Sequence, residues 1–161
     1  MALLEQLFST GGDGSGVTEM GAPAARYRVA PPPGYIYEIH RINACVEDET
    51  ALGGDLYSGI AALTNGINIT SKRGDEITLH TPQPIKKVGH WGLLAGVDMQ
   101  MTDFLAANND IFLVRWSITK YGGPIILNGN NGDYMEIDVR DDLSNISSHI
   151  VQAQGVSRWT G

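Results

Sequence analysis

The sequence predicts an all-β protein, an antiparallel β-sandwich or jelly-roll-like barrel with an extended N-terminal arm. Short segments rich in β-branched and aromatic residues alternate with turn signals, which gives about eight or nine strands. The chain has 20 glycines, as expected of a protein with many turns. Long helical patterns and the strand–helix alternation of a nucleotide-binding fold are absent. The 161 residues fit one domain with a sizeable core.

Residues 1–22 are predicted to form the arm, and residues 23–161 the β-sandwich domain. Four apolar residues near the start fall on one side of a short helix: Leu3, Leu4, Leu7 and Phe8. A helix this short is marginal in water by itself, so we expect it to dock on its own domain or on a neighbour. The stretch GGDGSG (11–16) is typical of a flexible linker. The four apolar residues are therefore the candidate contacts with a partner.

The first strands of the domain flank a proline-rich turn. Residues 26–29 alternate, and the PPPG stretch at 31–34 ends that strand. In the long segment 35–46 the apolar residues change from odd to even positions. This change of phase predicts a β-bulge near His40 and Arg41.

The middle of the chain carries further turn signals. Asn65-Gly66 lies between two apolar runs and predicts a type I′ hairpin over residues 60–70. Residues 72–76, which include an Arg-Gly-Asp tripeptide, predict a turn before a strand at 77–81. Segment 90–96 fits either a strand or a loop.

The third quarter of the chain contains a short helical pattern followed by the clearest strand pattern. Residues 102–108 predict one or two helical turns, with Thr102 or Asp103 as the N-cap. Segment 111–121 is the strongest strand, with alternate apolar residues on one face. Shorter strands are expected at 125–127 and 149–154.

Five acids crowd into residues 130–142 (NNGDYMEIDVRDD), which raises the possibility of a metal site. An EF-hand loop fails, because placing Gly132 at position 6 puts Leu127 at the first ligand position. Strand alternation over 134–139 explains the acids better, with the charged residues on a polar outer face and an Arg140–Asp138 pair. Asp141 or Asp142 is expected to cap a turn. Calcium bound in a different geometry stays open.

The sequence contains no motif for catalysis, cofactor binding or a metal, so we expect a protein that is not an enzyme. Cys45 is the single cysteine and offers no disulfide. The four histidines lack metal-ligand spacing and are expected to lie on the surface or in hydrogen-bonded core positions. Nucleophile-elbow and phosphate-loop patterns are absent.

Net charge and hydropathy limit the classes of partner that we expect for this protein. The net charge of −7 disfavours nucleic acid and anionic membranes, which attract basic surfaces. No apolar stretch is long enough to span a bilayer, and the N-terminus does not fit a secretory signal. We therefore expect a protein made in the cytoplasm.

Several segments together resemble the jelly-roll decoration (cement) proteins of tailed-bacteriophage capsids: YRVAPPPGYIYEIHRIN, LYSGIAALTNGINIT and NGDYMEIDVRDDLSNISSHIVQAQG. The resemblance covers roughly residues 26–155. It implies a structural virion protein, a homotrimer on the outer capsid surface that binds the major capsid protein and clamps neighbouring capsomers. It implies no catalytic residues.

The alternative is a carbohydrate-binding module of a phage tail or vertex, either receptor-binding or lectin-like. Trp91, Trp116 and Trp159 could stack on sugar rings, although Trp116 lies on an apolar strand face and is expected in the core. The Asn/Asp-rich loop at 128–133 could add polar contacts or a calcium ion.

Overall fold

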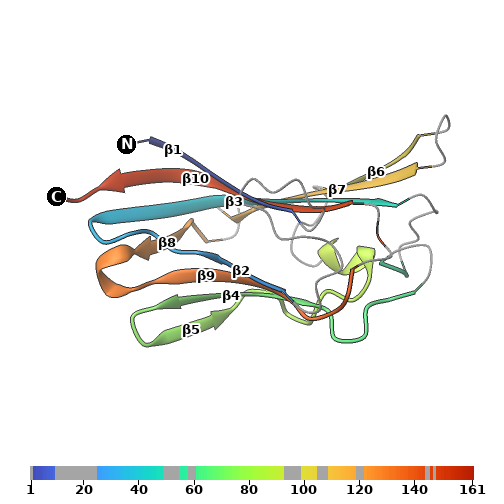
Figure 1. The fold of residues 1–161 in the computed structure, drawn as a ribbon, viewed down its shortest axis with the longest axis horizontal. Helices are drawn as coiled ribbons and strands as arrows, with labels where there is room; N and C mark the ends of the chain where they lie inside the picture. The colour runs from blue at the N-terminus through green and yellow to red at the C-terminus, as the bar shows by residue number, and fades with distance from the viewer. Residues whose placement is uncertain are drawn as a thin grey trace.

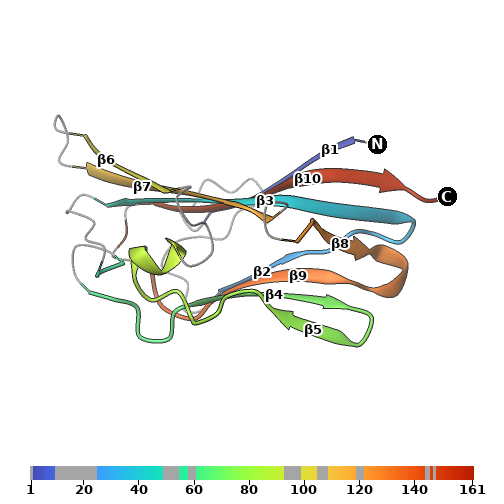
Figure 2. The ribbon, with the colours of Figure 1, turned by 180° about the vertical axis from the view of Figure 1, so that it is seen from behind.

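The protein consists of two antiparallel β-sheets packed face to face, seen from opposite sides in Figures 1 and 2. The computed structural model describes residues 2–9, 25–48, 55–57, 61–92, 99–104, 109–118, 122–143, 146 and 148–161. The six-stranded sheet has the order β1 (Ala2–Ser9), β10 (Ser148–Trp159), β3 (Tyr35–Asp48), β7 (Asn109–Ser117) and β6 (Met99–Phe104), and β8 (Ile125–Asn128) also pairs with β3. The four-stranded sheet has the order β2 (Ala25–Val29), β9 (Tyr134–Val139), β4 (Ile67–Arg73) and β5 (Glu76–Leu79). The all-β sandwich is thereby confirmed, whereas the jelly-roll connectivity and the arm stay predictions.

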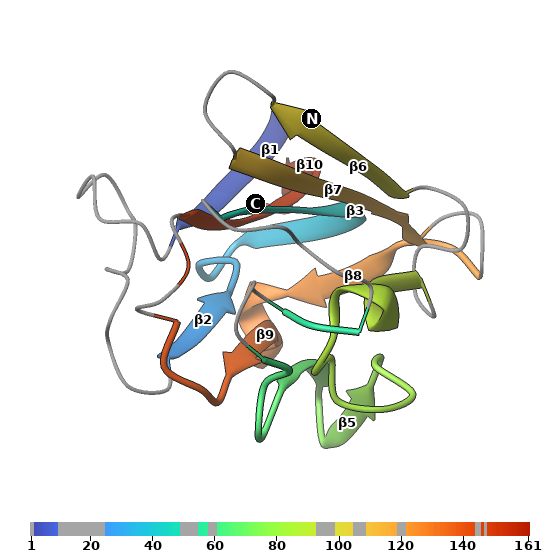
Figure 3. The ribbon, with the colours of Figure 1, turned by 90° about the vertical axis from the view of Figure 1, so that its right-hand side faces the viewer.

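The core lies between the two layers, which Figure 3 shows from one end. Strands β3, β4, β7, β9 and β10 contribute alternate residues, because successive side chains of a strand point to opposite faces. The buried residues include Ile42, Ala44 and Val46 of β3; Phe112, Val114 and Trp116 of β7; Ile67 and Ile69 of β4; Met135, Ile137 and Val139 of β9; and Val151 and Ala153 of β10.

The bulge expected near His40 is confirmed. Arg41 pairs with Gln154 and Ile39 with Gly155, so His40 is the extra residue on β3. On its other side, β3 pairs with β8 up to Ile39 and with β7 from Arg41 onwards. A Cβ atom at position 155 would lie 1.8 Å from the carbonyl oxygen of Glu38, so only glycine fits opposite the bulge.

The helix expected at the N-terminus is wrong. Residues 2–9 form β1, an outer strand of the six-stranded sheet, and Leu4 and Phe8 pair with Gly155 and Val151 of β10. Strand alternation puts positions 3 and 7 on one face of the sheet and positions 4 and 8 on the other. An eight-residue helix has few internal hydrogen bonds, whereas pairing with β10 satisfies the backbone along its length. The linker at 11–16 lies outside the described residues.

Two further expectations about local structure are wrong. Thr102 and Asp103 lie inside β6 and cap no helix, while residues 105–108 lie outside the described part. The hairpin across Asn65-Gly66 does not form, because the residues before it are not a strand and Leu63 N–H donates to the carbonyl of Lys86 instead. Segment 90–96 begins in a short 3₁₀ helix, η1 (Val88–Trp91). Pairing of β6 with β7 overrode the helical signal at 102–108, and the contact with Lys86 overrode the hairpin signal at Asn65-Gly66.

Candidate functional site

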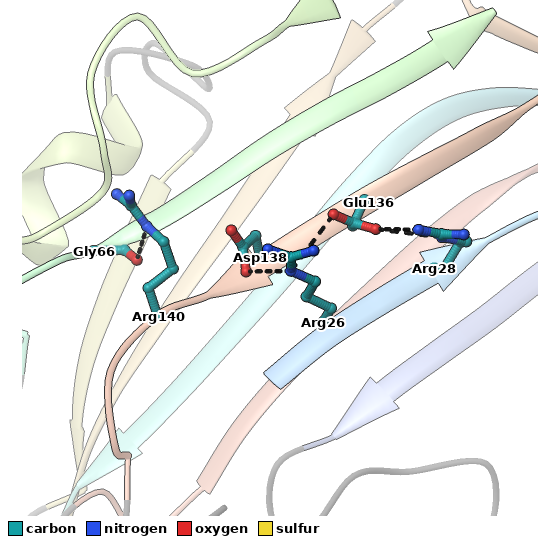
Figure 4. Close-up of polar contacts among 6 residues, drawn as sticks. All are labelled: Arg26, Arg28, Gly66, Glu136, Asp138 and Arg140. Atoms are coloured by element: carbon teal, nitrogen blue, oxygen red, sulfur yellow. Dashed lines mark hydrogen bonds and ion pairs between the residues drawn. The ribbon is translucent and has the colours of Figure 1, made fainter. Parts of the chain in front are cut away.

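The acidic segment forms half of a ladder of ion pairs on the outer face of the four-stranded sheet (Figure 4). Glu136 of β9 accepts a hydrogen bond of 2.8 Å from Arg28 of β2, and Asp138 lies 3.4 Å from Arg26. The guanidinium of Arg28 also lies 3.9 Å from the ring centroid of Tyr134. The predicted alternation of β9 is confirmed, and these acids are neutralised by arginines of the neighbouring strand.

Asp141 holds the Asn65-Gly66 turn. Its carboxylate accepts hydrogen bonds from the backbone N–H groups of Thr64, Asn65 and Gly66, at distances from 2.6 to 3.1 Å. Arg140 donates to the carbonyl oxygens of Asn65 and Gly66, so its expected pairing with Asp138 is wrong. Asp141 or Asp142 was expected to cap the turn that follows its own strand, whereas the carboxylate of Asp141 binds backbone N–H groups of a segment 75 to 77 positions away.

Asp133 ties two other turns together. It is buried, and its carboxylate accepts from Asn128 N–H at 2.9 Å and from Gly74 N–H at 2.7 Å. Because Gly74 lies in the β4–β5 turn, this carboxylate fixes that turn against the loop before β9. Among the residues that the structure describes, no cluster of three or more acids, histidines or cysteines could hold a metal ion.

The first candidate surface is the β5 edge, which we define as residues 76–79 at the margin of the four-stranded sheet. Ile77 and Leu79 are exposed by 68% and 55%. Pairing places them opposite Lys72 and Thr70 of β4, and therefore on the same outer face as the ion-pair ladder. Two adjacent, exposed, branched apolar side chains on an edge strand form a surface suited to burial by another chain.

The second candidate surface is the Ser71–His80 cleft, a cavity of about 250 Å³ between the two sheets. The cleft is lined by Ser71, Arg73, Thr78, His80, Trp116, Ile118, Gly122, Gly123, Pro124 and Ile125.

A serine–histidine pair forms part of the cleft lining. Ser71 Oγ is 2.8 Å from His80 Nε2, and the His80 ring is tilted against Trp116 with centroids 5.8 Å apart. Burial, and secondarily the charge of Arg73, lower the pKa of His80, which favours the neutral ring. Ser71 is only 2% exposed, so its hydroxyl serves to fix the imidazole and is poorly placed to attack a substrate. The arrangement provides a neutral donor–acceptor ring, a cation and an apolar wall.

A second histidine–hydroxyl contact is closed to solvent. Tyr57 Oη lies 2.7 Å from His149 Nε2, and Trp91 Nε1–H donates to the same oxygen at 3.2 Å. Since the tyrosine oxygen accepts from tryptophan, its own proton points to Nε2 of a neutral His149. All three side chains are fully buried. Burial raises the pKa of Tyr57 and lowers the pKa of His149 to about 4.

The structure separates the three tryptophans considered for sugar stacking. Trp91 is fully buried and bonded to Tyr57, so its ring has no face open to a sugar. Trp116 lies in the core, as expected, and its side chain borders the cleft. Trp159 is 72% exposed near the C-terminus.

The cleft and the β5 edge were missed in the sequence because both depend on strand pairing. Ser71 and His80 are nine positions apart, and only the β4–β5 register, with Ser71 opposite Thr78, makes them diagonal neighbours. The two-residue turn at Gly74-Asp75 was the signal that could have revealed this pairing.

No family model, curated protein or solved structure matches this chain. Within the described part of the chain, no helix has the length and apolar character needed to cross a bilayer.

Proposed function

We propose that the chain is a structural virion protein that decorates and stabilises the outer surface of a tailed-phage capsid. The β5 edge carries the proposal, because its exposed Ile77 and Leu79 form an apolar strip that a neighbouring subunit can cover. The location on a capsid comes from the resemblance of the sequence segments. The partners are the major capsid protein and further copies of this chain, arranged as a homotrimer.

The other features of the outer face agree with an assembly role. The ion pairs of β2 and β9 lie on the same face as the apolar strip, with β4 between them, and their arginines are exposed. The face therefore has the mixed apolar and polar character of a subunit contact. Individual contacts of this kind are weak, and repetition over a symmetric shell multiplies them. The net charge of −7 suits a surface that does not face packaged nucleic acid.

A binding assay tests this role. Capsids assembled from the major capsid protein of the same phage are sedimented with the full chain, and bound protein is quantified. The double variant Ile77→Lys, Leu79→Lys should lose at least about 1.4 kcal/mol of binding, a tenfold weakening, because it buries two charges in the contact. Leu113→Lys is the matched control, since Leu113 is an exposed apolar residue of β7 in the other sheet. Equal binding by the double variant and the control contradicts the role of the edge, and no binding by the unaltered chain contradicts the capsid role.

We infer a second candidate function, recognition of a carbohydrate, from the Ser71–His80 cleft. Sugar-binding sites combine an aromatic wall with a few polar groups that fix orientation, and Trp116, His80 and Arg73 supply these elements. A glycan array probed with the unaltered chain and with Arg73→Ala tests this function. Loss of a glycan signal in Arg73→Ala supports it, and the absence of any signal in the unaltered chain removes it.

A further inference from the structure

The two edges of the four-stranded sheet differ in how they meet solvent. The β2 edge carries Arg26 and Arg28, both exposed and both paired with acids of β9. Charged side chains on an edge strand discourage pairing with another chain. The β5 edge has one charged residue, Glu76 at its start, and exposes Ile77 and Leu79 along the rest of the strand, so this margin of the sheet is the less protected one.

The backbone of β5 also presents open hydrogen-bonding groups at this margin. His80 N–H donates to the carbonyl of Ile69 on β4, which fixes the alternation of the hairpin. The even-numbered residues of β5 therefore bond to β4, and the N–H and C=O groups of Ile77 and Leu79 point away from it. The residues with exposed apolar side chains are thus the same residues that offer backbone donors and acceptors.

We propose that β5 pairs edge to edge with β5 of a second copy of this chain, antiparallel and about a two-fold axis through Thr78. This contact rests on the assembly role proposed above and names its partner. Ile77 of each copy lies opposite Leu79 of the other, and these two pairs exchange four backbone hydrogen bonds. The two four-stranded sheets become one continuous sheet of eight strands.

The register follows from side-chain complementarity. A two-fold axis perpendicular to the sheet keeps each face on its own side, so a residue of one face must meet a residue of the same face. Pairing Ile77 with itself puts Asp75 opposite Leu79, and pairing Leu79 with itself puts Ile77 opposite Thr81. Only the axis at Thr78 matches both apolar residues, and it also sets Glu76 opposite His80.

The contact is small, so it depends on repetition over a larger assembly. Four residues from each copy bury less than the roughly 1,000 Å² of a stable interface. A closed trimer contains no two-fold axis, so the contact joins subunits of neighbouring trimers. A covalent trap is therefore the appropriate probe.

Cysteine cross-linking of the full chain tests the register, in a Cys45→Ser background that removes the native thiol. Across the proposed axis the two Thr78 residues form a pair without hydrogen bonds, whose Cα atoms lie about 4.5 Å apart, close enough for a disulfide. The matched control is Glu76→Cys, because its two copies would lie about 14 Å apart. Under mild oxidation Thr78→Cys should give about tenfold more dimer than Glu76→Cys.

Two more variants sharpen the result. A mixture of Glu76→Cys and His80→Cys should cross-link where neither does alone. Adding Ile77→Pro to Thr78→Cys should abolish the dimer while keeping the fold, since the Ile77 N–H is not used by β4; circular dichroism checks the fold. Equal cross-linking of Thr78→Cys and Glu76→Cys overturns the contact. A Thr78→Cys dimer without capsid binding supports the contact and overturns the capsid role. Capsid binding without a Thr78→Cys dimer supports the capsid role and overturns the contact.

Discussion

Two histidines of this protein make nearly the same contact in opposite surroundings. His149 lies 2.7 Å from the hydroxyl of Tyr57, and His80 lies 2.8 Å from the hydroxyl of Ser71. The first contact is sealed in the core with Trp91, whereas the second lines an open cleft. Distance alone would assign both the same role. Burial separates them, because a sealed polar group depends wholly on its protein partners while one beside a cleft can exchange them for water.

The largest expected effect is on the sealed contact. Tyr57→Phe removes the hydroxyl between Trp91 and His149 and leaves a buried donor and a buried acceptor without their partner. We expect a loss on the order of 3 kcal/mol in the free energy of unfolding, measured by urea denaturation. Tyr35→Phe is the matched control, since Tyr35 is exposed and should change stability by less than about 0.5 kcal/mol. Equal losses in both variants contradict the difference between the two environments.

The next largest effect is a pH dependence of the free energy of unfolding that is caused by His149. The pKa of His149 is about 4 in the folded protein, against an ordinary value of 6.5. The unfolded chain therefore binds a proton that the folded chain refuses, so stability is retained above pH 6.5 and falls as the pH decreases towards 4.

Lowering the pH from 7 to 5 should reduce the free energy of unfolding by about 2 kcal/mol through His149. His149→Gln carries no titrating group and serves as the comparison, with urea denaturation at each pH. The slope of the unaltered chain minus that of the variant isolates the contribution of His149. Identical slopes would show that the imidazole is not sealed from protons.

A smaller effect is expected at the open contact. Ser71→Ala removes the hydroxyl that fixes His80, and water in the cleft can replace it. The loss in unfolding free energy should be about 1 kcal/mol. A loss as large as that of Tyr57→Phe, in the same denaturation assay, would mean that the cleft is closed in solution.

The smallest effect is expected at the rim of the cleft. Arg73 is exposed and, among the described residues, has no ion-pair partner. Arg73→Gln should therefore change the free energy of unfolding by no more than about 0.5 kcal/mol. A larger loss, seen as a shift of the denaturation midpoint, would place this arginine in the structural framework and remove it from the candidate ligand-binding groups.

Features of single strands and turns could be predicted where they depend on neighbouring residues in the sequence. The alternation of β9, the turns at Gly74 and Gly132 and the bulge at His40 follow from residue type and phase. The N-terminal segment was misassigned, because the spacing of Leu3, Leu4, Leu7 and Phe8 fits one face of a helix, whereas a strand divides them between its two faces. A segment of eight residues is too short for local spacing to decide between helix and strand, and pairing with β10 decided it.

The two candidate surfaces could not be predicted from local sequence patterns. Nothing near Asp141 shows that its carboxylate holds a turn 75 to 77 positions away. Ser71 and His80 are polar residues with no motif, and Ile77 and Leu79 have the pattern of any strand face. Their roles arise from which strand lies at the margin of the sheet.

The fold class, the alternation of β9 and the turns at Gly74 and Gly132 could be predicted from local patterns, because side-chain alternation and backbone preferences act over a few residues. Packing of the whole chain was needed to show which histidine is sealed, which acids bind turns and which strand lies at an edge. Those outcomes depend on contacts between residues far apart in the chain, and burial sets the energy of each polar contact only after the two sheets have packed together.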